Sequence, residues 1–232
     1  MIEIRTKVLA VIAARGGSKG LTRKNILDLA GSPLIAWTIK AAKESKFISK
    51  VVLSSDNEEI MEVAKRYDCE VPFKRPSYLA TDNATSVDVL NHAIEYCPGY
   101  DFVILLQPTS PLRTAEDIDA AFELMISLNA KSCVSVCTTL KTPYWMYSLG
   151  EDGVLKKLLQ TPKDIVNRQN APETFELNGA IYIIDINYFK NEQSLIPEET
   201  VAYVMDRSVS VDIDCQADLD LCETYLTQET YD

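Results

Sequence analysis

Apolar, β-branched segments alternate along this chain with segments whose apolar residues recur at helical spacing. Continuous apolar runs are typical of strands buried on both faces, and helices between such strands are typical of a parallel sheet covered on each side. We therefore predict an α/β fold with α/β/α layers and a mostly parallel sheet. The predicted strands are 8–14, 50–55, 102–107, 132–138, 179–185 and 201–204, and the predicted helices are 33–45, 58–67, 86–96, 115–128 and 217–226.

The predicted helix 115–128 shows the helical pattern most clearly. Thr114 precedes it and Asp117 follows three residues later, which is the sequence signature of a capping box. Its apolar residues are expected on one buried face. These residues are Ile118, Phe122, Met125 and Ile126.

The alternation breaks between about residues 139 and 178. Prolines, aromatic residues and short strand-like pieces fill this stretch, which is too short for a core of its own. We therefore expect a single domain, 1–232, with an inserted arm at about 139–178. The arm carries Tyr144, Trp145 and Tyr147, and contiguous aromatic surface of this kind is unfavourable in water, which favours a homodimer.

Composition narrows the classes of function. The chain has 232 residues, 47% hydrophobic and 25% charged, so we expect a folded domain with a sizeable core. The formal net charge of -11 argues against a general nucleic-acid binder, because a phosphate backbone requires a basic surface. The longest apolar run is too short to cross a membrane and no signal peptide is evident, so we expect a cytoplasmic protein without membrane attachment.

Cysteine and histidine chemistry is disfavoured by the sequence. The cysteines lack CxxC pairs and zinc-like spacing, so we expect reduced and mostly buried thiols. The one histidine, His92, lies in a predicted helix where a structural role is expected. This excludes catalysis by histidine pairs or triads. The cysteines are Cys69, Cys97, Cys133, Cys137, Cys215 and Cys222.

The first predicted strand ends in a basic, glycine-rich loop, "ARGGSKGLTRKN". In an open parallel α/β sheet, ligands bind beyond the carboxyl ends of the strands, where this loop lies. Glycines allow close backbone approach, and cations beside exposed N–H groups form polyphosphate sites, although the spacing matches neither the P-loop nor the dinucleotide fingerprint. The alternative is a solvated basic turn. The glycines are Gly16, Gly17 and Gly20, and the cations are Arg15, Lys19, Arg23 and Lys24.

A second polar cluster follows the predicted strand 102–107, in "LLQPTSPLRT". A helix-entry turn is the alternative interpretation, and it explains Thr114 as a cap. It does not explain Gln107, which we interpret as a ligand contact. The polar residues expected at this edge of the sheet are Gln107, Thr109, Ser110 and Arg113, with Pro108 and Pro111 stiffening the segment.

Two aspartates lie near the C-terminus in "VDIDCQADLD". In an extended segment Asp212 and Asp214 point to the same face, about 7 Å apart. Paired carboxylates fit Mg²⁺, which takes hard oxygen ligands and often shares its shell with phosphates. The alternative is a pair of solvated aspartates on an edge strand, but a neighbouring polyphosphate site favours the metal.

The motifs "AARGGSKGLTRKN", "RPSYLATDNATS", "LLQPTSPLR", "NGAIYI" and "SVDIDCQADLDL" occur here in the order found in one family. The chain resembles the CMP-sialic acid synthetases, or acylneuraminate cytidylyltransferases, a group that includes the CMP-legionaminic acid synthetases. The resemblance runs from about residue 8 to residue 226 and implies a Rossmann-like domain with an arm exchanged across a homodimer. It also implies transfer of CMP from CTP to a nonulosonic acid, with release of pyrophosphate and with Mg²⁺, or Mn²⁺ in its place.

The resemblance further implies roles for particular residues. The triphosphate contacts and the cytosine or ribose contacts together are Arg15, Gly16, Gly17, Ser18, Lys24, Asn25, Arg75 and Ser86. The sugar contacts are Gln107 and, reaching from the arm towards the partner subunit, Arg168. The metal ligands are Asp212 and Asp214, and the residues expected to act in catalysis are Arg15, Lys24, Asp212 and Asp214.

Two departures concern the sugar half of the site. Neuraminate-activating members tend to carry a lysine near the position of Trp145 and an arginine just before the "NGAIY" motif. This chain has Trp145, Glu176 and Leu177 there instead. The expected acceptor is therefore a legionaminic-type diamino nonulosonate rather than N-acetylneuraminate.

Two other functions share parts of this pattern. A metal-dependent nucleotide-sugar glycosyltransferase also combines a Rossmann-like sheet with acidic residues, but no D-x-D of that kind follows a mid-chain strand here. A non-enzymatic nucleotide-binding protein would bind CTP without turnover. Release of pyrophosphate from CTP distinguishes the transferase from both alternatives.

Overall fold

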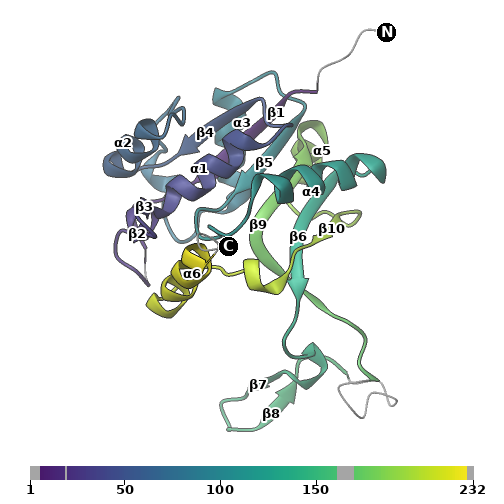
Figure 1. The fold of residues 1–232 in the computed structure, drawn as a ribbon. Coiled ribbons are helices and arrows are strands. Elements are labelled where there is room, and N and C mark those ends of the chain that lie inside the picture. The colour runs from purple at the N-terminus through teal and green to yellow at the C-terminus, as the bar shows by residue number, and fades with distance from the viewer. Residues whose placement is uncertain (1–5, 19, 161–169, 229–232) are drawn as a thin grey trace.

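A six-stranded sheet forms the centre of the protein in the computed structural model, which describes residues 6–18, 20–160 and 170–228 (Figure 1). Its strands are β1 (Val8–Ala13), β4 (Lys50–Ser54), β5 (Phe102–Leu106), β6 (Ser132–Thr138), β9 (Phe175–Asp185) and β10 (Val201–Val204). They lie in the order β10-β6-β9-β5-β1-β4. β1 is parallel to β4 and β5, and β10 is parallel to β6, whereas β9 is antiparallel to both of its neighbours. The prediction of a mostly parallel sheet is confirmed.

Helices cover both faces of the sheet because alternate residues of each strand point to opposite sides. The helices are α1 (Leu34–Glu44), α2 (Glu58–Arg66), α3 (Ser86–Tyr96), α4 (Ala115–Ser127), α5 (Ile186–Glu192) and α6 (Gln216–Gln228). Ala10 and Ile12 of β1 share one core with residues of α1, α2 and α4. Leu9 and Val11 share the opposite core with residues of α3 and α5. The α/β/α layering is therefore as predicted.

A third and smaller core packs a hairpin from the first part of the chain against the C-terminal segment. The hairpin of β2 (Asp28–Leu29) and β3 (Ser32–Pro33) contributes Leu29, and the C-terminal segment contributes Ile213 and Leu219. Short 3-10 turns flank this region and the loops above the sheet. They are η1 (Lys24–Ile26), η2 (Ser77–Leu79), η3 (Pro143–Trp145) and η5 (Arg207–Val209). Burial of Ile213 brings the segment around it against the loop that follows β1.

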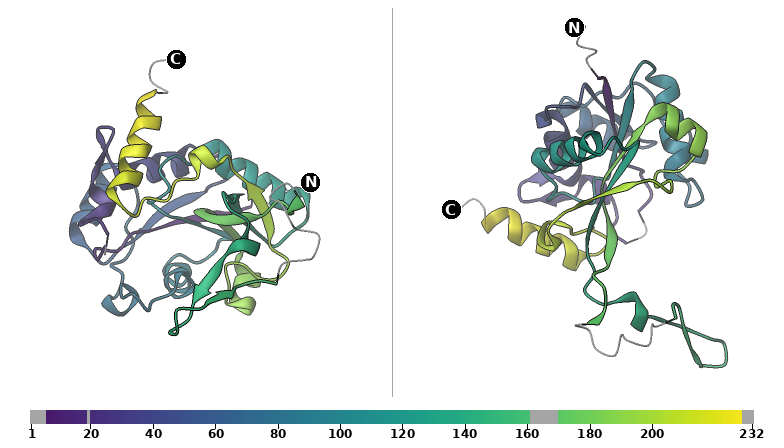
Figure 2. Two further views of the ribbon diagram at one scale, coloured as in Figure 1. Left: turned by 90° about the horizontal axis from the view of Figure 1, so that it is seen from below. Right: turned by 90° about the vertical axis from the view of Figure 1, so that its right-hand side faces the viewer.

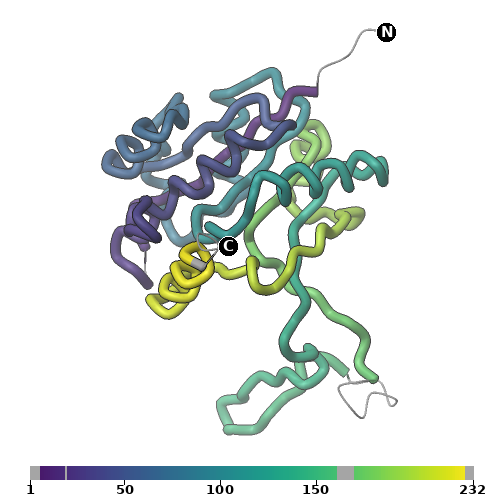
Figure 3. The backbone as a smooth tube through the Cα atoms, in the orientation of Figure 1, coloured from purple at the N-terminus to yellow at the C-terminus, as the bar shows by residue number. Residues whose placement is uncertain are grey.

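Between β6 and β9 the chain leaves the body as an arm, of which the structure describes residues 139–160 and 170–174 (Figures 2 and 3). The arm contains η3 and a small antiparallel hairpin of β7 (Tyr147–Leu149) and β8 (Leu155–Lys157). Its root is a ribbon in which the first residues of β9 pair with the last residues of β6. Large apolar side chains on the described part of the arm are exposed. They are Leu140, Trp145, Met146, Tyr147, Leu149, Val154, Leu155, Leu158 and Leu159.

The structure corrects two details of the predicted elements. β9 begins at Phe175, four residues before the predicted start at 179, because its first residues pair only with β6 in the root of the arm. On α4, Ile118, Phe122 and Met125 are buried, but Ile126 is 51% exposed and lies off the core-facing stripe. The capping box of Thr114 and Asp117 is present.

The cysteines and the histidine occupy structural positions. Five cysteines are buried, Cys215 is exposed, and all are free thiols. His92 lies on α3 and is buried against Phe73 and Tyr96, with its ring centroid 4.6 Å from that of Phe73. Among the helices of the described residues, none has both the length and the apolar character needed to cross a bilayer.

Candidate active site

A cleft of about 450 Å³ opens above the carboxyl ends of β1 and β5, as expected for a parallel α/β sheet. The glycine-rich loop, the loop 79–86, the end of β5 and the segment around Ile213 all contribute to its walls. The lining residues that the sequence predicted are Arg15, Gly17, Ser18, Gly20, Lys24, Asn25, Arg75, Ser86, Gln107, Asp212 and Asp214. The cations of the first loop and the aspartates near the C-terminus therefore face the same space.

The start of the glycine-rich loop is held by polar contacts on both sides. The backbone N–H of Gly16 donates to Oδ1 of Asp56 at 2.9 Å, and Nδ2 of Asn25 donates to the carbonyl oxygen of Arg15 at 3.0 Å. Nη2 of Arg15 lies 2.8 Å from Oδ1 of Asp82, so this ion pair joins the loop to the opposite wall. The side chain of Arg15 is 34% exposed and is thus accessible to an anionic ligand.

Lys24 connects the glycine-rich loop to the acidic segment. Its Nζ donates to the carbonyl oxygen of Ile213 at 2.7 Å and to Oδ1 of Asp214 at 3.0 Å. Gly20 reinforces this approach, because a Cβ at that position would collide with the carbonyl oxygen of Asp214. The two segments, far apart in sequence, are packed too closely here for any residue except glycine.

Asp212 and Asp214 flank a buried residue, as the predicted alternation requires. Ile213 is fully buried, and its N–H donates to the carbonyl oxygen of Thr109 at 2.8 Å. Asp212 lines the cleft, and partial loss of water raises the pKa of its carboxyl. A hydrogen bond from Thr109 acts in the opposite direction, and the charge on Asp214 adds to the increase.

The donor set at these aspartates fits a hard divalent cation. Two carboxylates line the same cleft, and Mg²⁺ is commonly bound by one or two carboxylates together with water and substrate phosphates. Within the described residues no cluster of three or more His, Cys, Asp or Glu side chains forms a complete protein cage. The arrangement therefore suits an ion that arrives with, or is completed by, a phosphate ligand.

The wall opposite the aspartates carries Arg75 and Ser86. Arg75 is buried, and it donates from Nε to Oγ of Ser54 at 3.0 Å and from Nη2 to the carbonyl oxygen of Ser54 at 2.6 Å. Burial lowers the pKa of Arg75 to about 10, so the guanidinium keeps its charge at neutral pH. Ser86 begins α3 directly after the capping residue Thr85, which places it at the helix N-terminus facing the cleft.

Gln107 follows the last residue of β5 and reaches towards a glycine of the "NGAIYI" motif. Its Oε1 lies 2.7 Å from the position that a Cβ of Gly179 would occupy, and Gly179 has a φ of +74°. Both features require glycine at 179. Oδ2 of Asp212 lies 3.8 Å from the same point, so Gln107 and Asp212 converge there.

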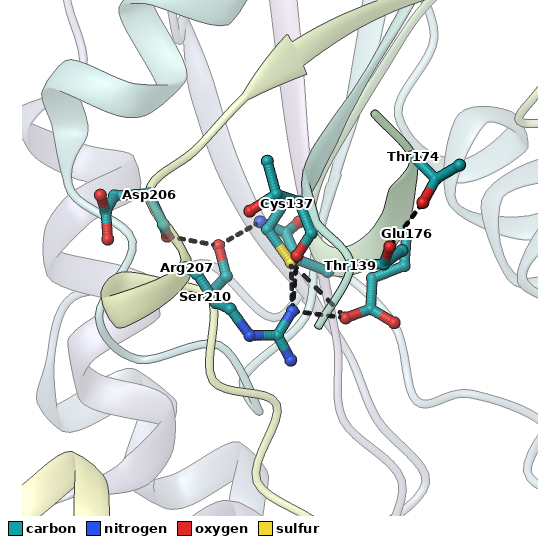
Figure 4. A network of polar contacts seen from close by, with 9 residues as sticks. Cys137, Thr139, Thr174, Glu176, Asp206, Arg207 and Ser210 are labelled. Carbon is teal, nitrogen blue, oxygen red and sulfur yellow. Dashed lines mark hydrogen bonds and ion pairs between the residues drawn. The ribbon is translucent and has the colours of Figure 1, made fainter. Parts of the chain in front are cut away.

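A polar network fixes the root of the arm beside this convergence (Figure 4). Nη1 of Arg207 donates to Oε1 of Glu176 at 2.7 Å and to the carbonyl oxygen of Thr138 at 2.6 Å. Nδ2 of Asn178 donates to Oγ of Ser210 at 3.0 Å. Ser210 precedes Asp212 by two residues. Glu176 and Arg207 also line a second hollow of about 640 Å³, which shares Asp212 with the first cleft.

Some predicted site residues lie elsewhere. Arg23 is expected from the sequence among the cations of the phosphate site, but its Nη2 lies 2.9 Å from Oε2 of Glu59 and it is absent from the lining of the cleft. Its backbone is left-handed, with a φ of 58°. Gly16 lies behind the lining, and Lys19 and Arg168 fall outside the described residues.

Sequence reasoning missed other residues that line the cleft. Asp82 and Thr81 belong to the motif "RPSYLATDNATS", from which the resemblance assigns only Arg75 and Ser86 to the site. Thr109 is expected at the end of β5 but has no role in the predicted site. The motifs that contain these residues are the sequence signal that could have found them. A motif does not by itself show which of its side chains point into the cleft.

A parallel α/β sheet whose strand ends present a cationic glycine-rich loop and a pair of carboxylates to one cleft defines a class, the α/β nucleotidyltransferases. Residues 9–201 match the family model described as "Cytidylyltransferase". The chain belongs to this cytidylyltransferase family.

Individual relatives agree with the family match. The chain is 38% identical to a CMP-N,N'-diacetyllegionaminic acid synthase of Legionella pneumophila, covering 94% of this chain and 95% of that protein. It is 35% identical to an N-acylneuraminate cytidylyltransferase of Escherichia coli over 95% of its own length but only 52% of that protein, so it spans about half of it. A solved CMP:2-keto-3-deoxy-manno-octonic acid synthetase complexed with CTP superposes with a TM-score of 0.73 at 17% identity, covering 97% of this chain and 100% of that one. This last likeness shows the shared fold.

Proposed function

We propose that the protein transfers CMP from CTP to the anomeric hydroxyl of a nonulosonic acid and releases pyrophosphate. The observation that carries the proposal is the convergence of Arg15, Lys24, Asp212 and Asp214 on one cleft at the strand ends. The names of the two relatives, an N-acylneuraminate cytidylyltransferase and a CMP-diacetyllegionaminic acid synthase, support the same chemistry. Family membership favours it over the glycosyltransferase alternative.

The nucleotide would lie along the glycine-rich loop. Arg15 and Lys24 bind the β- and γ-phosphates, and each exchanges its present carboxylate, Asp82 or Asp214, for a phosphate oxygen. Gly17, Ser18 and Asn25 surround the phosphates, and Arg75 with Ser86 contacts the cytosine or ribose from the opposite wall. Charge neutralisation and positioning of this kind are the main needs of phosphoryl-type transfer.

The metal would be held by Asp212 and Asp214, whose carboxylate oxygens suit Mg²⁺ or Mn²⁺. A bound ion would act as a Lewis acid and neutralise phosphate charge beside these aspartates. When Lys24 exchanges Asp214 for a phosphate oxygen, its ammonium would still hold the neighbouring carbonyl oxygen of Ile213, which leaves the Asp214 carboxylate to the metal.

The acceptor would approach from the side of Gln107. Its anomeric oxygen attacks the α-phosphorus in line, the bond from that phosphorus to the β-phosphate oxygen breaks, the hydroxyl proton is released and pyrophosphate departs. Gln107, beside Asp212, orients the acceptor with its amide, and Arg15 and Lys24 stabilise the charge that builds on the leaving group. Arg168 is the further sugar contact, from the arm of a partner subunit.

The acceptor we favour is a legionaminic-type diamino nonulosonate. Glu176 stands where neuraminate-activating members tend to carry an arginine, and here it is paired with Arg207 at the edge of the second hollow. The 38% identity to a CMP-N,N'-diacetyllegionaminic acid synthase supports the same choice.

We propose that the active form is a cytoplasmic homodimer, built on the single domain, 1–232, with its arm at about 139–178. The exposed apolar side chains of the arm, such as Trp145 at 42% and Leu155 at 63%, support coverage by a second copy. Free thiols at all described cysteines fit a reducing compartment.

Pyrophosphate release from CTP, measured across a panel of nonulosonic acids, tests the proposal. Turnover is expected with CTP and not with ATP, GTP or UTP, with the highest kcat/KM on diacetyllegionaminic acid among the panel. Tight CTP binding without turnover on any acceptor would contradict the transferase assignment, and a preference for N-acetylneuraminate would contradict only the choice of acceptor.

A further inference from the structure

Arg113, at the end of the "LLQPTSPLR" motif, is buried behind the cleft and not in its lining. Its residue exposure is 2%, and it is among the largest fully buried side chains of the described chain. None of the ion pairs among the described residues involves it, and its Nε and Nη2 have no hydrogen-bond partner there. A charged side chain in such a position requires a physical reason, because burial of an unpaired charge is costly.

The Arg113 guanidinium links β5 and β9 where the next residue pair of their ladder would otherwise form. That ladder ends at the pair Leu106 and Ile181. The next residues along the two strands are Gln107 and Ala180, and Nη1 of Arg113 donates to both of their carbonyl oxygens, at 3.3 and 3.0 Å. One side chain therefore ties the backbone of Gln107 to β9 at the point where regular pairing stops.

The neighbouring residues of β9 form an irregularity that side chains hold open. Register between β6 and β9 shifts between Val134 and Val136. The N–H of Ala180 donates to Oδ1 of Asn178 at 3.2 Å, and the N–H of Ile181 donates to Oγ of Ser135 at 2.8 Å. Irregularities of this kind are frequent beside active sites because they re-aim side chains. This one presents Gly179 to Gln107 and Asp212.

Stability alone does not account for an arginine at this position. Burial lowers the pKa of Arg113 to about 10, so it remains a cation at neutral pH and its desolvation is not relieved by loss of the proton. Apolar side chains of similar volume often replace buried charges at no loss of stability. What an apolar side chain does not supply is the bridge between the carbonyls of Gln107 and Ala180.

We propose that Arg113 is a positioning residue that fixes Gln107 against Gly179, so that the Gln107 amide meets the acceptor acid beside Asp212. This inference rests on the proposed transfer of CMP to a nonulosonic acid. Arg113 touches neither substrate and acts through Gln107. Oγ1 of Thr38 and the N–H of Ser110 also donate to the Gln107 carbonyl oxygen, each at 3.4 Å, but neither reaches Ala180, so loss of the bridge removes the tie of Gln107 to β9. A resulting misplacement of about 1 Å costs roughly 100-fold in rate.

A double-mutant cycle of Arg113→Met and Gln107→Ala tests the proposal. Arg113→Met is expected to lower kcat/KM for the acceptor by about 100-fold, while the Kd for CTP, measured by calorimetry without acceptor, stays close to wild type. In the Gln107→Ala background the same change is expected to cost little more, because its effect passes through Gln107. Arg66→Met, on the exposed surface of α2, is the matched control and is expected to behave as wild type.

Each other outcome overturns the inference. Additive losses in the cycle, or equal losses in CTP affinity and acceptor kcat/KM, would show that Arg113 is a general structural residue. If Arg113→Met does not fold, the cycle is repeated with Arg113→Lys, which keeps the charge and whose loss must likewise vanish when Gln107 is absent. A wild-type enzyme that turns over no acceptor refutes the proposed function itself, whereas an active wild type with a silent Arg113→Met refutes only the role of Arg113.

Discussion

Arg15 and Arg23 come from the same basic loop and have the same chemistry, yet the structure gives them different surroundings. Arg15 lines the cleft, while Arg23 pairs with Glu59 on the surface. Arg23 also has a left-handed backbone, at the residue that precedes η1. Position relative to the cleft, and not charge, decides which arginine can reach a phosphate.

Arg15→Ala is expected to remove about 3 kcal/mol of transition-state stabilisation, roughly 150-fold in kcat/KM. Arg23→Ala is the matched control and should change kcat/KM by less than about twofold, since exposed ion pairs contribute little. Steady-state pyrophosphate release measures both. Equal losses in the two variants would contradict the assignment of Arg15 to the triphosphate.

Asp212→Asn removes one of the two carboxylates that line the cleft. We expect binding of Mn²⁺ in the presence of CTP, followed by electron paramagnetic resonance, to weaken by at least about tenfold, and turnover to fall with it. Asp220→Asn on α6, where the carboxylate only accepts from Gln216, is the matched control. Unchanged Mn²⁺ binding in Asp212→Asn would remove this residue from the metal site.

His92 makes stability depend on pH near neutrality. Its burial lowers the pKa below the ordinary value of 6.5. As the pH falls through 6.5, the unfolded chain binds a proton at His92 more readily than the folded chain, so the free energy of unfolding decreases. Thermal unfolding between about pH 7.5 and 5.5 should therefore show a steeper decline in Tm for wild type than for His92→Gln. Parallel curves would rule out this contribution.

At the scale of elements, the site depends on contact between the loop after β1 and the segment before α6. Lys24 bonds to Ile213 and Asp214, and Gly20 packs on the carbonyl of Asp214. Burial of Ile213 in the third core supplies the free energy that holds the second segment in place. The cations and the carboxylates are therefore positioned by one packing contact.

Gly20→Ala tests that contact. The added methyl group would push the two segments apart, and because catalytic geometry is sensitive to shifts of about 1 Å, kcat/KM is expected to fall about 100-fold. Gly17→Ala is the comparison, since a Cβ at Gly17 meets nothing within 4 Å, and it should lose clearly less. Circular dichroism should show both variants folded. A smaller loss in Gly20→Ala than in Gly17→Ala would contradict the importance of the contact.

At the scale of the whole molecule, the arm extends from the body on the β6–β9 ribbon (Figure 1). The apolar side chains of its described part are exposed. The cleft lies at the carboxyl ends of the strands, which is the edge of the sheet from which the ribbon extends. An arm exchanged between two copies would bury these side chains.

Trp145→Glu is expected to convert the proposed dimer into a monomer, because a carboxylate in a buried apolar interface is costly. Light scattering after size-exclusion chromatography gives the mass, and kcat/KM for the acceptor should fall with dimer content while the Kd for CTP remains. Leu128→Glu, at an exposed apolar residue that follows α4, is the control and should leave the mass unchanged. A wild-type monomer with full activity would refute the exchange.

Local sequence pattern by itself determined much of this protein. Apolar periodicity placed the strands and helices to within a few residues, and the capping box of α4 followed from Thr114 and Asp117 alone, because these signals depend on contacts within a single segment. The alternation of Asp212, Ile213 and Asp214 likewise predicted that the two carboxylates point to the same face, and both line the cleft. The resemblance of ordered motifs then supplied the family that the comparisons confirmed.

Tertiary structure decided what depends on distant segments. Four features depend on contacts between parts of the chain that no local pattern links. They are the antiparallel position of β9, the pairing of Arg23 with Glu59 outside the cleft, the contact of Gly20 with Asp214 and the burial of Arg113. Hydrophobic burial acts on area without regard to sequence separation, and hydrogen bonds form wherever packing leaves a carbonyl without a partner. For this reason the sequence indicates the candidate site residues, whereas the tertiary fold brings them together in one cleft.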